Sequence, residues 1–109
     1  MSGYKILEQA LALMGIYSIS QEVKRAGLLI INIVCEDLKL SGLSKLEENF
    51  EYKNQKELIA LTYGVAMELA LTMSDDYLKQ TFQVLYSKKR SEIKNSISSV
   101  KDSVFKGEI

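Results

Sequence analysis

Histidine, tryptophan and proline are absent from the 109-residue chain, and cysteine occurs once, as Cys35. Histidine is the commonest general base near neutral pH and the commonest zinc ligand, so its absence removes the usual acid–base and zinc chemistry. A single cysteine excludes an intrachain disulfide and a cysteine-rich metal cluster. We therefore expect that the protein is not an enzyme and that it has no catalytic, cofactor-binding or metal-binding residues.

An excess of charge of either sign is also missing, because 14 basic residues balance 14 acidic ones. Non-specific binding to nucleic acid depends on neutralising phosphates, so a neutral chain is a poor general nucleic-acid binder. The charge is nevertheless uneven: residues 36–76 hold 4 basic and 9 acidic side chains, whereas residues 77–109 hold 7 and 3. An acidic middle and a basic C-terminal part suit association between identical subunits or docking on an acidic partner.

Long apolar runs are absent as well. The longest run, Gly27–Cys35, contains Asn32 and is far shorter than the ~20 residues of a membrane span. The apolar N-terminal stretch Ile6–Tyr17 lacks a small-residue cleavage site. We expect a chain that has no membrane partner and stays inside the cell during its synthesis.

Apolar residues recur at helical spacing in four stretches, and the lack of proline favours long helices. Gly15 is expected to end the first helix, Ser18 or Ser20 to cap the second, and Ser74 to cap the fourth ahead of two acids. The predicted helices are Tyr4–Met14, about Ser20 to Leu40, Gln55–Met73, and from Ser74–Asp76 to about Lys106.

These elements predict an all-α fold of one domain, with a helical core over residues 1–87 and a C-terminal helical extension over residues 88–109. The second and third helices are apolar on more than one face, and Gly64 in the third allows another helix to approach closely. An irregular acidic loop is expected between these two helices. One alternative remains for Leu28–Val34, which could form a strand because Ile and Val favour strands.

Two features could be chemical sites, and each has a simpler interpretation. The acids of the loop could bind a metal, but no complementary ligand set accompanies them, which favours a solvated acidic loop. Cys35 as a nucleophile would need a basic partner, so a buried, inert thiol is the simpler expectation.

The basic and aromatic residues near the C-terminal half also allow two interpretations. Lys88, Lys89 and Arg90 could grip phosphates or form a solvated helix face. The aromatic side chains could stack on a ligand, but their helical spacing favours packing in the core or between subunits. These aromatic residues are Tyr63, Tyr77, Phe82 and Tyr86.

The stretch from Leu46 to about Lys94 has an ordered pattern that covers a little under half of the chain. In order, it contains Leu46-Glu47-Glu48, Leu61-Thr62-Tyr63-Gly64-Val65-Ala66, Leu69-Ala70, the acidic break Ser74-Asp75-Asp76, and Phe82 and Tyr86 in a lysine-rich helix. This pattern resembles the small all-helical head–tail connector (adaptor or head-completion) proteins of tailed bacteriophages. The chain departs from the family in lacking the prolines that often mark the acidic loop and in having a longer, serine-rich C-terminus.

The resemblance implies a four-helix connector-type bundle with a long C-terminal helix. It implies a structural virion protein that forms a ring, commonly of twelve subunits, and docks on the portal protein. Such a ring extends the DNA channel without sequence-specific binding and gives a tail or tail-completion protein its attachment surface. The expected location is the head–tail junction of the virion, after assembly in the host cytoplasm, and no cofactor is implied.

The C-terminal segment is the expected partner-binding surface, because its apolar stripe is too narrow and too distant to be fully used in a monomer core. A neighbouring subunit and the portal are rival destinations, and a frayed solvated tail is the alternative. Truncation after Ser87 is expected to leave a folded core that no longer assembles. The partner-binding residues are Lys88, Lys89, Arg90, Ile93, Lys94, Ile97, Val100, Val104 and Phe105, and the subunit-contact loop is Glu47, Glu48 and Glu51.

Two other functions remain open. The chain could be a small helical nucleic-acid-binding or regulatory module that uses its basic fourth helix, although the zero net charge counts against this function. An enzyme ranks last, because the acid–base and nucleophile sets are missing.

Overall fold

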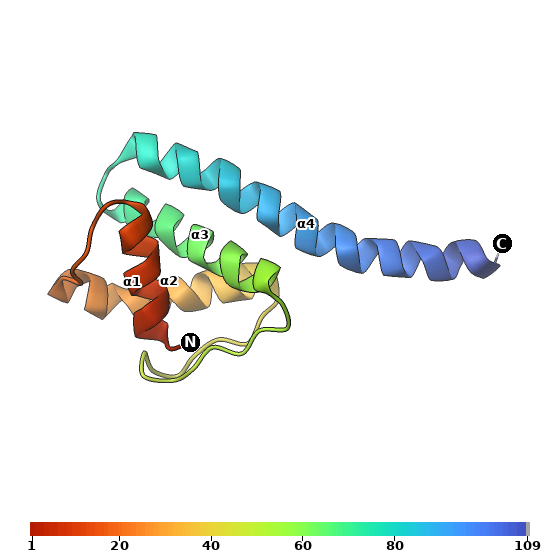
Figure 1. Ribbon diagram of the computed structural model, residues 1–109, viewed down its shortest axis with the longest axis horizontal. Helices are drawn as coiled ribbons and strands as arrows, with labels where there is room; N and C mark the ends of the chain where they lie inside the picture. The colour runs from red at the N-terminus through yellow and green to blue at the C-terminus, as the bar shows by residue number, and fades with distance from the viewer. Residues whose placement is uncertain (109) are drawn as a thin grey trace.

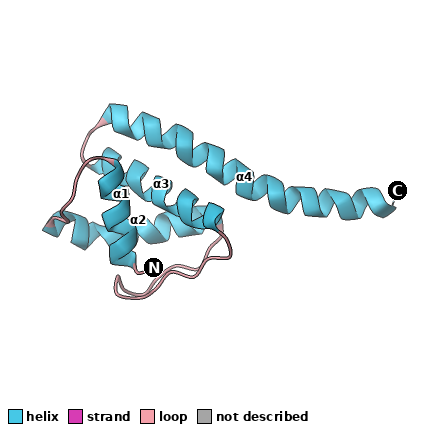
Figure 2. Ribbon diagram, viewed as in Figure 1, coloured by secondary structure: helices cyan, strands magenta, loops and turns pink. Residues whose placement is uncertain are grey.

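The computed structural model describes the backbone of residues 1–108 and the side chains of residues 1–94. The backbone in this range folds into four helices and no extended strand (Figures 1 and 2). The all-α prediction is confirmed, and the strand alternative for Leu28–Val34 is wrong because that stretch lies inside the second helix. The helices are α1 (Gly3–Leu13), α2 (Gln21–Leu38), α3 (Gln55–Thr72) and α4 (Asp76–Glu108).

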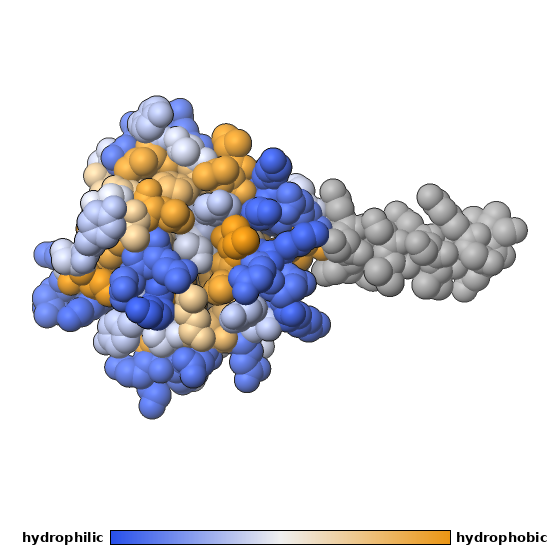
Figure 3. Space-filling view, in the orientation of Figure 1, coloured by the Kyte–Doolittle hydropathy of each residue, from blue (hydrophilic) through white to orange (hydrophobic). Residues whose placement is uncertain are grey.

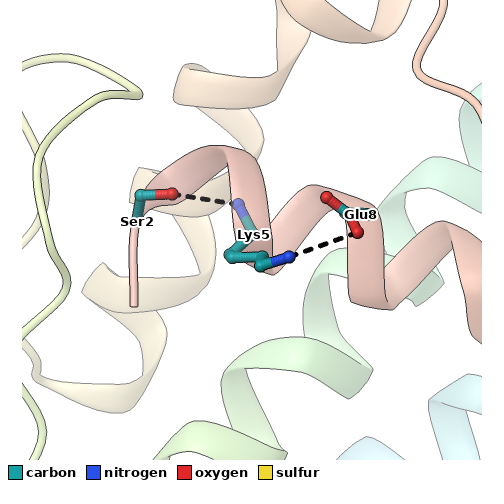
Figure 4. A network of polar contacts seen from close by, with 3 residues as sticks. All are labelled: Ser2, Lys5 and Glu8. Atoms are coloured by element: carbon teal, nitrogen blue, oxygen red, sulfur yellow. Dashed lines mark hydrogen bonds and ion pairs between the residues drawn. The ribbon is translucent and has the colours of Figure 1, made fainter.

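Helix α1 has a defined cap at each end. The Ser2 hydroxyl accepts a hydrogen bond from the backbone N–H of Lys5 at 3.2 Å, and the Lys5 ammonium pairs with Glu8 at 3.4 Å (Figure 4). At the other end Gly15 has a φ of +77°, and the next N–H, of Ile16, bonds back to the Leu11 carbonyl at 2.9 Å. Glycine adopts this left-handed conformation at the least cost, and the φ of Gly15 together with the Ile16 hydrogen bond confirms the predicted stop.

Helix α2 begins after Ser20, not Ser18. The Ser20 hydroxyl accepts from the N–H of Val23 at 3.2 Å. The helix ends with Lys39 in the left-handed conformation, at φ 61°, and the following N–H, of Leu40, bonds to the Cys35 carbonyl at 2.8 Å. A lysine therefore occupies a position that glycine usually takes.

The expected serine cap of α4 is wrong. Ser74 has a φ of 57° and belongs to the end of α3, where the N–H of Asp75 bonds to the Ala70 carbonyl at 3.0 Å. The cap of α4 is Asp75, whose Oδ1 accepts from the N–H of Leu78 at 3.0 Å. A cap residue lies directly before the helix, and its side-chain oxygen accepts a hydrogen bond from the backbone N–H three residues later. Asp75 meets both conditions for α4.

Helix α3 is the central element and packs against the other three helices. It lies beside α4, which runs back along it in the opposite direction after the short turn at residues 73–75 (Figure 1). A Cβ added to Gly64 would lie 2.5 Å from Val34 Cγ1 and 2.8 Å from Tyr86 Cε1. The predicted close approach at Gly64 is therefore confirmed, and it involves two helices, α2 and α4.

The segment of residues 39–54 is irregular, as predicted, but it is anchored to the body. Leu43, Leu46 and Phe50 are buried in the core. The Asn32 side chain holds the loop through two hydrogen bonds, donating to the Leu43 carbonyl at 2.9 Å and accepting from the Leu43 N–H at 2.8 Å. The loop also pairs with the N-terminus, where the Gly3 N–H donates to the Glu48 carbonyl at 3.1 Å. The loop is therefore packed against the helices and hydrogen-bonded to them as an integral part of the fold.

Helix α4 passes the expected core boundary at residues 87 and 88 without a break. Ile93 is half-buried and packs against the core, so the body of the protein continues at least to this residue. At ~1.5 Å per residue a helix over Asp76–Glu108 is about 50 Å long. Figure 1 shows its C-terminal part running out beyond the other helices. Among the described helices, none is both long enough and apolar enough to cross a membrane.

Candidate functional site

The basic segment of α4 makes contacts within its own chain. The Lys89 ammonium lies 3.0 Å from Glu92 Oε2. Arg90 reaches across to Asp37 at the end of α2, with Nε 2.7 Å from Oδ2 and Nη2 donating to Oδ1 at 3.2 Å. Lys88 is exposed. Two of the predicted partner-binding cations are thus engaged in ion pairs, of which only Arg90–Asp37 joins α4 to another helix.

Asp37 also accepts a hydrogen bond from the Tyr86 hydroxyl, so one carboxylate ties two α4 side chains to α2. This bond, together with the Arg90 guanidinium, outweighs desolvation and lowers the pKa of Asp37 below its ordinary 3.8. Burial, followed by the bond to Asp37, raises the pKa of the Tyr86 hydroxyl, so this phenol remains neutral and a donor. We call Asp37, Tyr86 and Arg90 the α2–α4 clamp.

Sequence reasoning missed the α2–α4 clamp, although one signal was available. Asp37 lies in the last turn of α2, where a carboxylate faces the negative end of the helix dipole. An acid in that unfavourable position indicates a cationic or donor partner from elsewhere in the fold. The partner itself is 49 or 53 residues away and could not be identified from local spacing.

The three predicted subunit-contact acids are spread along the anchored loop. Glu47 and Glu51 are exposed, and Glu48 is half-buried. Over the described side chains, no group of three or more cysteine, aspartate or glutamate residues is placed to hold a metal ion. The geometry of the loop therefore provides exposed negative charge at separate points.

Cys35 and three of the four aromatic residues are packing residues. Cys35 is 1% exposed, and burial raises the pKa of its thiol to about 11, so the thiolate nucleophile is scarce at neutral pH. The rings of Tyr63 and Phe82 lie 6.4 Å apart between α3 and α4, and Tyr86 is buried beside Gly64. Tyr77 differs, since it is 79% exposed at the start of α4.

A groove of about 600 Å³ lies between α1, the first half of α3 and the end of the loop. Its walls include Leu13 from α1, Ile59 and Tyr63 from α3, and Tyr52 from the loop. Apolar residues gather over this part of the molecule in the view of Figure 3. Sequence reasoning did not find this groove, because its walls come from three segments that only the fold brings together.

The remaining predicted partner-binding residues differ in their surroundings. Lys94 is exposed, and Ile93 lines a cleft of about 440 Å³ with Leu38 and Tyr52 at the point where α4 leaves the body. The side chains of Ile97, Val100, Val104 and Phe105 lie outside the described residues.

Comparisons with protein-family models, curated proteins and solved structures each find no match for this chain.

Proposed function

We propose that the protein is a structural virion component, a head–tail connector of a tailed bacteriophage. In this proposal its subunits form a ring, of about twelve by resemblance to the family, that docks on the portal protein. The ring extends the DNA channel and offers a tail or tail-completion protein its attachment surface. It occupies the head–tail junction of the virion after assembly in the host cytoplasm.

The observation that carries the proposal is the extension of α4 past the body. Ile93 is the last residue of the described side chains that packs on the core, yet the helix continues to Glu108. A helical segment without tertiary packing is marginal in water, because most helical stability in proteins comes from packing one apolar face. The residues beyond Ile93 repeat apolar types at positions 97, 100 and 104, as a helix seated on another surface would. A second protein chain is the natural source of that surface.

Exposed apolar residues on the body support the same proposal. Leu29 and Ile33 lie one turn apart on α2 and are 65% and 46% exposed. Val84 on α4 is 69% exposed. Single exposed apolar residues are normal, but an exposed pair on α2 together with an exposed residue on α4 suits a subunit that contacts others on more than one side.

The alternative of a nucleic-acid-binding module receives less support from the geometry. Phosphate binding needs cations that are free to replace counterions. Arg90 is held by Asp37, and Lys89 is paired with Glu92. Of the predicted cations, Arg90 therefore serves the tertiary fold, Lys89 is paired within its own helix, and Lys88 and Lys94 are exposed.

The test compares the complete chain with a variant ending after Lys94. The structure moves this cut from Ser87 to Lys94, because Arg90 and Ile93 belong to the body. We expect the complete chain to form rings visible by electron microscopy, alone or on a portal ring from the same genome. The shortened chain should remain folded by circular dichroism and fail to assemble.

Two results would contradict the proposal. One is a complete chain that stays monomeric alone and does not bind the portal ring. The other is a neighbouring gene set with no portal or capsid gene. A gel shift at physiological ionic strength that disappears with Lys88→Ala and Lys94→Ala together would instead support the nucleic-acid alternative.

A further inference from the structure

The groove between α1 and α3 is preformed by ring contacts on two of its walls. Tyr52 stacks on the buried ring of Phe50, with centroids 6.1 Å apart and ring planes 11° apart. Tyr63 packs against Phe82 of α4. Because both aromatic walls are held by other parts of the fold, an occupant would not have to order them on binding.

Among the described residues, no charged side chain lines this groove, and Met1, which carries the N-terminal ammonium, forms part of its wall. Its other lining side chains are mostly apolar or aromatic, and the polar ones are the amides of Gln9 and Gln55 and the hydroxyl of Thr62, which donates to the Leu58 carbonyl at 2.9 Å. The nearest charges along α1, Lys5 and Glu8, are paired with each other at 3.4 Å (Figure 4). The groove therefore suits an occupant whose contact face is apolar and uncharged, because an isolated buried charge is costly.

One segment of the chain has that character, and the helix that carries it runs out beyond the other helices (Figure 1). Residues 95–106 carry Ile97, Val100 and Val104 at spacings of three and four, with serines between them and only three charged residues. Such spacing places the apolar residues on one face of a helix. The preceding segment, residues 88–94, is a poorer occupant because it holds four cations and one acid.

The direction of α4 excludes the groove of the same molecule. The helix is continuous over Asp76–Glu108 and runs away from α1 (Figure 1). Residues 95–106 could reach their own groove only if the helix broke after the body. A second copy of the chain can present the same segment without such a break.

We propose that residues 95–106 of one copy dock, as a helix, in the α1–α3 groove of a second copy. The contact is heterologous, because residues 95–106 of each subunit meet the groove of the next subunit. Repetition of such a contact can close a ring. The inference rests on the proposed function, because it requires the subunits to associate with one another. It goes further by naming the two surfaces that are in contact, residues 95–106 and the α1–α3 groove.

Cysteine cross-linking tests the contact directly. A Leu13→Cys copy is mixed with Ile97→Cys, Val100→Cys or Val104→Cys copies that carry a mass tag, and a short bismaleimide is added. Cys35 serves in every sample as a buried, unreactive internal control. We expect cross-linked heterodimers for at least one tail position and none for Leu71→Cys, which is 55% exposed outside the groove.

Each of the following results would contradict the proposed contact. In the doubly substituted chain Leu13→Cys/Val100→Cys, a link within one copy would show that the tail folds back on its own groove. The absence of any link from Leu13→Cys, in a sample that still assembles, would show that the ring uses other surfaces, and the proposed function would stand. A chain that neither cross-links nor assembles would contradict both proposals.

Sedimentation of charge variants gives an independent measure. Leu13→Glu and Val100→Asp should each weaken self-association by about 100-fold, since each places an unpaired charge in an apolar contact. The matched controls Leu71→Glu and Ser99→Asp add the same charge outside the groove and off the stripe. They should change the dissociation constant by less than about twofold. Equal effects of the variants and their controls would overturn the docking.

Discussion

Tyr86 and Asp37 are 49 residues apart in the sequence and joined by a hydrogen bond from the phenol to the carboxylate. The bond connects the first half of α4 to the last turn of α2. Arg90 completes the α2–α4 clamp from one turn further along α4. The clamp thus ties α4 to α2 in addition to the packing of α4 on α3.

Replacement of Tyr86 by phenylalanine should test the clamp without removing the buried ring. Tyr86→Phe should lower the free energy of unfolding by about 1 kcal/mol, the usual net value of one hydrogen bond. Urea unfolding followed by circular dichroism gives the difference. Tyr77→Phe is the matched control, because Tyr77 is 79% exposed on the same helix. Equal stabilities of Tyr86→Phe and the unaltered chain would show that the bond contributes nothing.

The clamp should make stability depend on pH through Asp37. Its pKa is lowered in the folded protein, chiefly by the Tyr86 hydrogen bond, so the ionised form is favoured by folding. The contribution is complete above the ordinary pKa of 3.8 and is lost as the pH falls through the lower, folded value.

Urea unfolding of the unaltered chain and of Asp37→Asn between about pH 6 and about pH 3 measures this dependence. The stability gap between the two chains should shrink toward acid pH. Other carboxylates titrate in both chains, so the gap isolates Asp37. A gap that stays constant over this range would contradict the assigned direction of the shift.

The substitution Gly64→Ala has two opposing effects on stability: it increases helix propensity and it crowds the packing of α3 against α2 and α4. In an exposed helix this change would stabilise the chain by up to about 1 kcal/mol. At Gly64 the new Cβ would lie 2.5 Å from Val34 Cγ1 and 2.8 Å from Tyr86 Cε1, so α2 or α4 must shift. Overpacking of this kind costs about 1–3 kcal/mol, and we expect a net loss of stability in urea unfolding. A more stable Gly64→Ala chain would mean that the helices can separate freely.

The exposed Ser87→Ala on α4 provides the control for this measurement, because it increases helix propensity without a close neighbour helix. It should leave stability unchanged or slightly higher.

Asn32 should control the order of the acidic loop. Asn32→Ala removes both hydrogen bonds to the Leu43 backbone and should lower stability by about 1–2 kcal/mol. Hydrogen exchange of the Leu43 amide should accelerate, because its acceptor is gone. Asn32→Asp keeps an acceptor for that amide and loses only the donor to the Leu43 carbonyl. It should therefore protect the amide better than Asn32→Ala, and equal exchange in both variants would contradict the assigned bonds.

Much of the fold followed from local patterns. The apolar spacing predicted the four helices, the stop at Gly15 is confirmed, and of the two serines predicted to begin α2 the structure selects Ser20. The error at Ser74 arose because two motifs overlap there: the left-handed end of α3 and the cap of α4 occupy adjacent residues. The spacing of residues alone does not show that Ser74 belongs to the end of α3 and Asp75 to the cap of α4.

The predicted partner-binding surface shows where local reasoning ends. The positive charge of residues 88–94 was evident in the sequence, but the pairing of Arg90 with Asp37 required two helices to be placed. The packing of Ile93 against the core required the loop and the end of α2. Charge and hydropathy belong to each residue, whereas a partner is assigned by the fold.

The sequence by itself determined the helical class and the caps that act over three or four residues. Those properties depend on composition and on contacts within one turn of helix. Only the tertiary structure decided the central position of α3, the α2–α4 clamp and the groove beside α1. Each of these joins segments far apart in the chain, and their meeting depends on how whole helix faces pack.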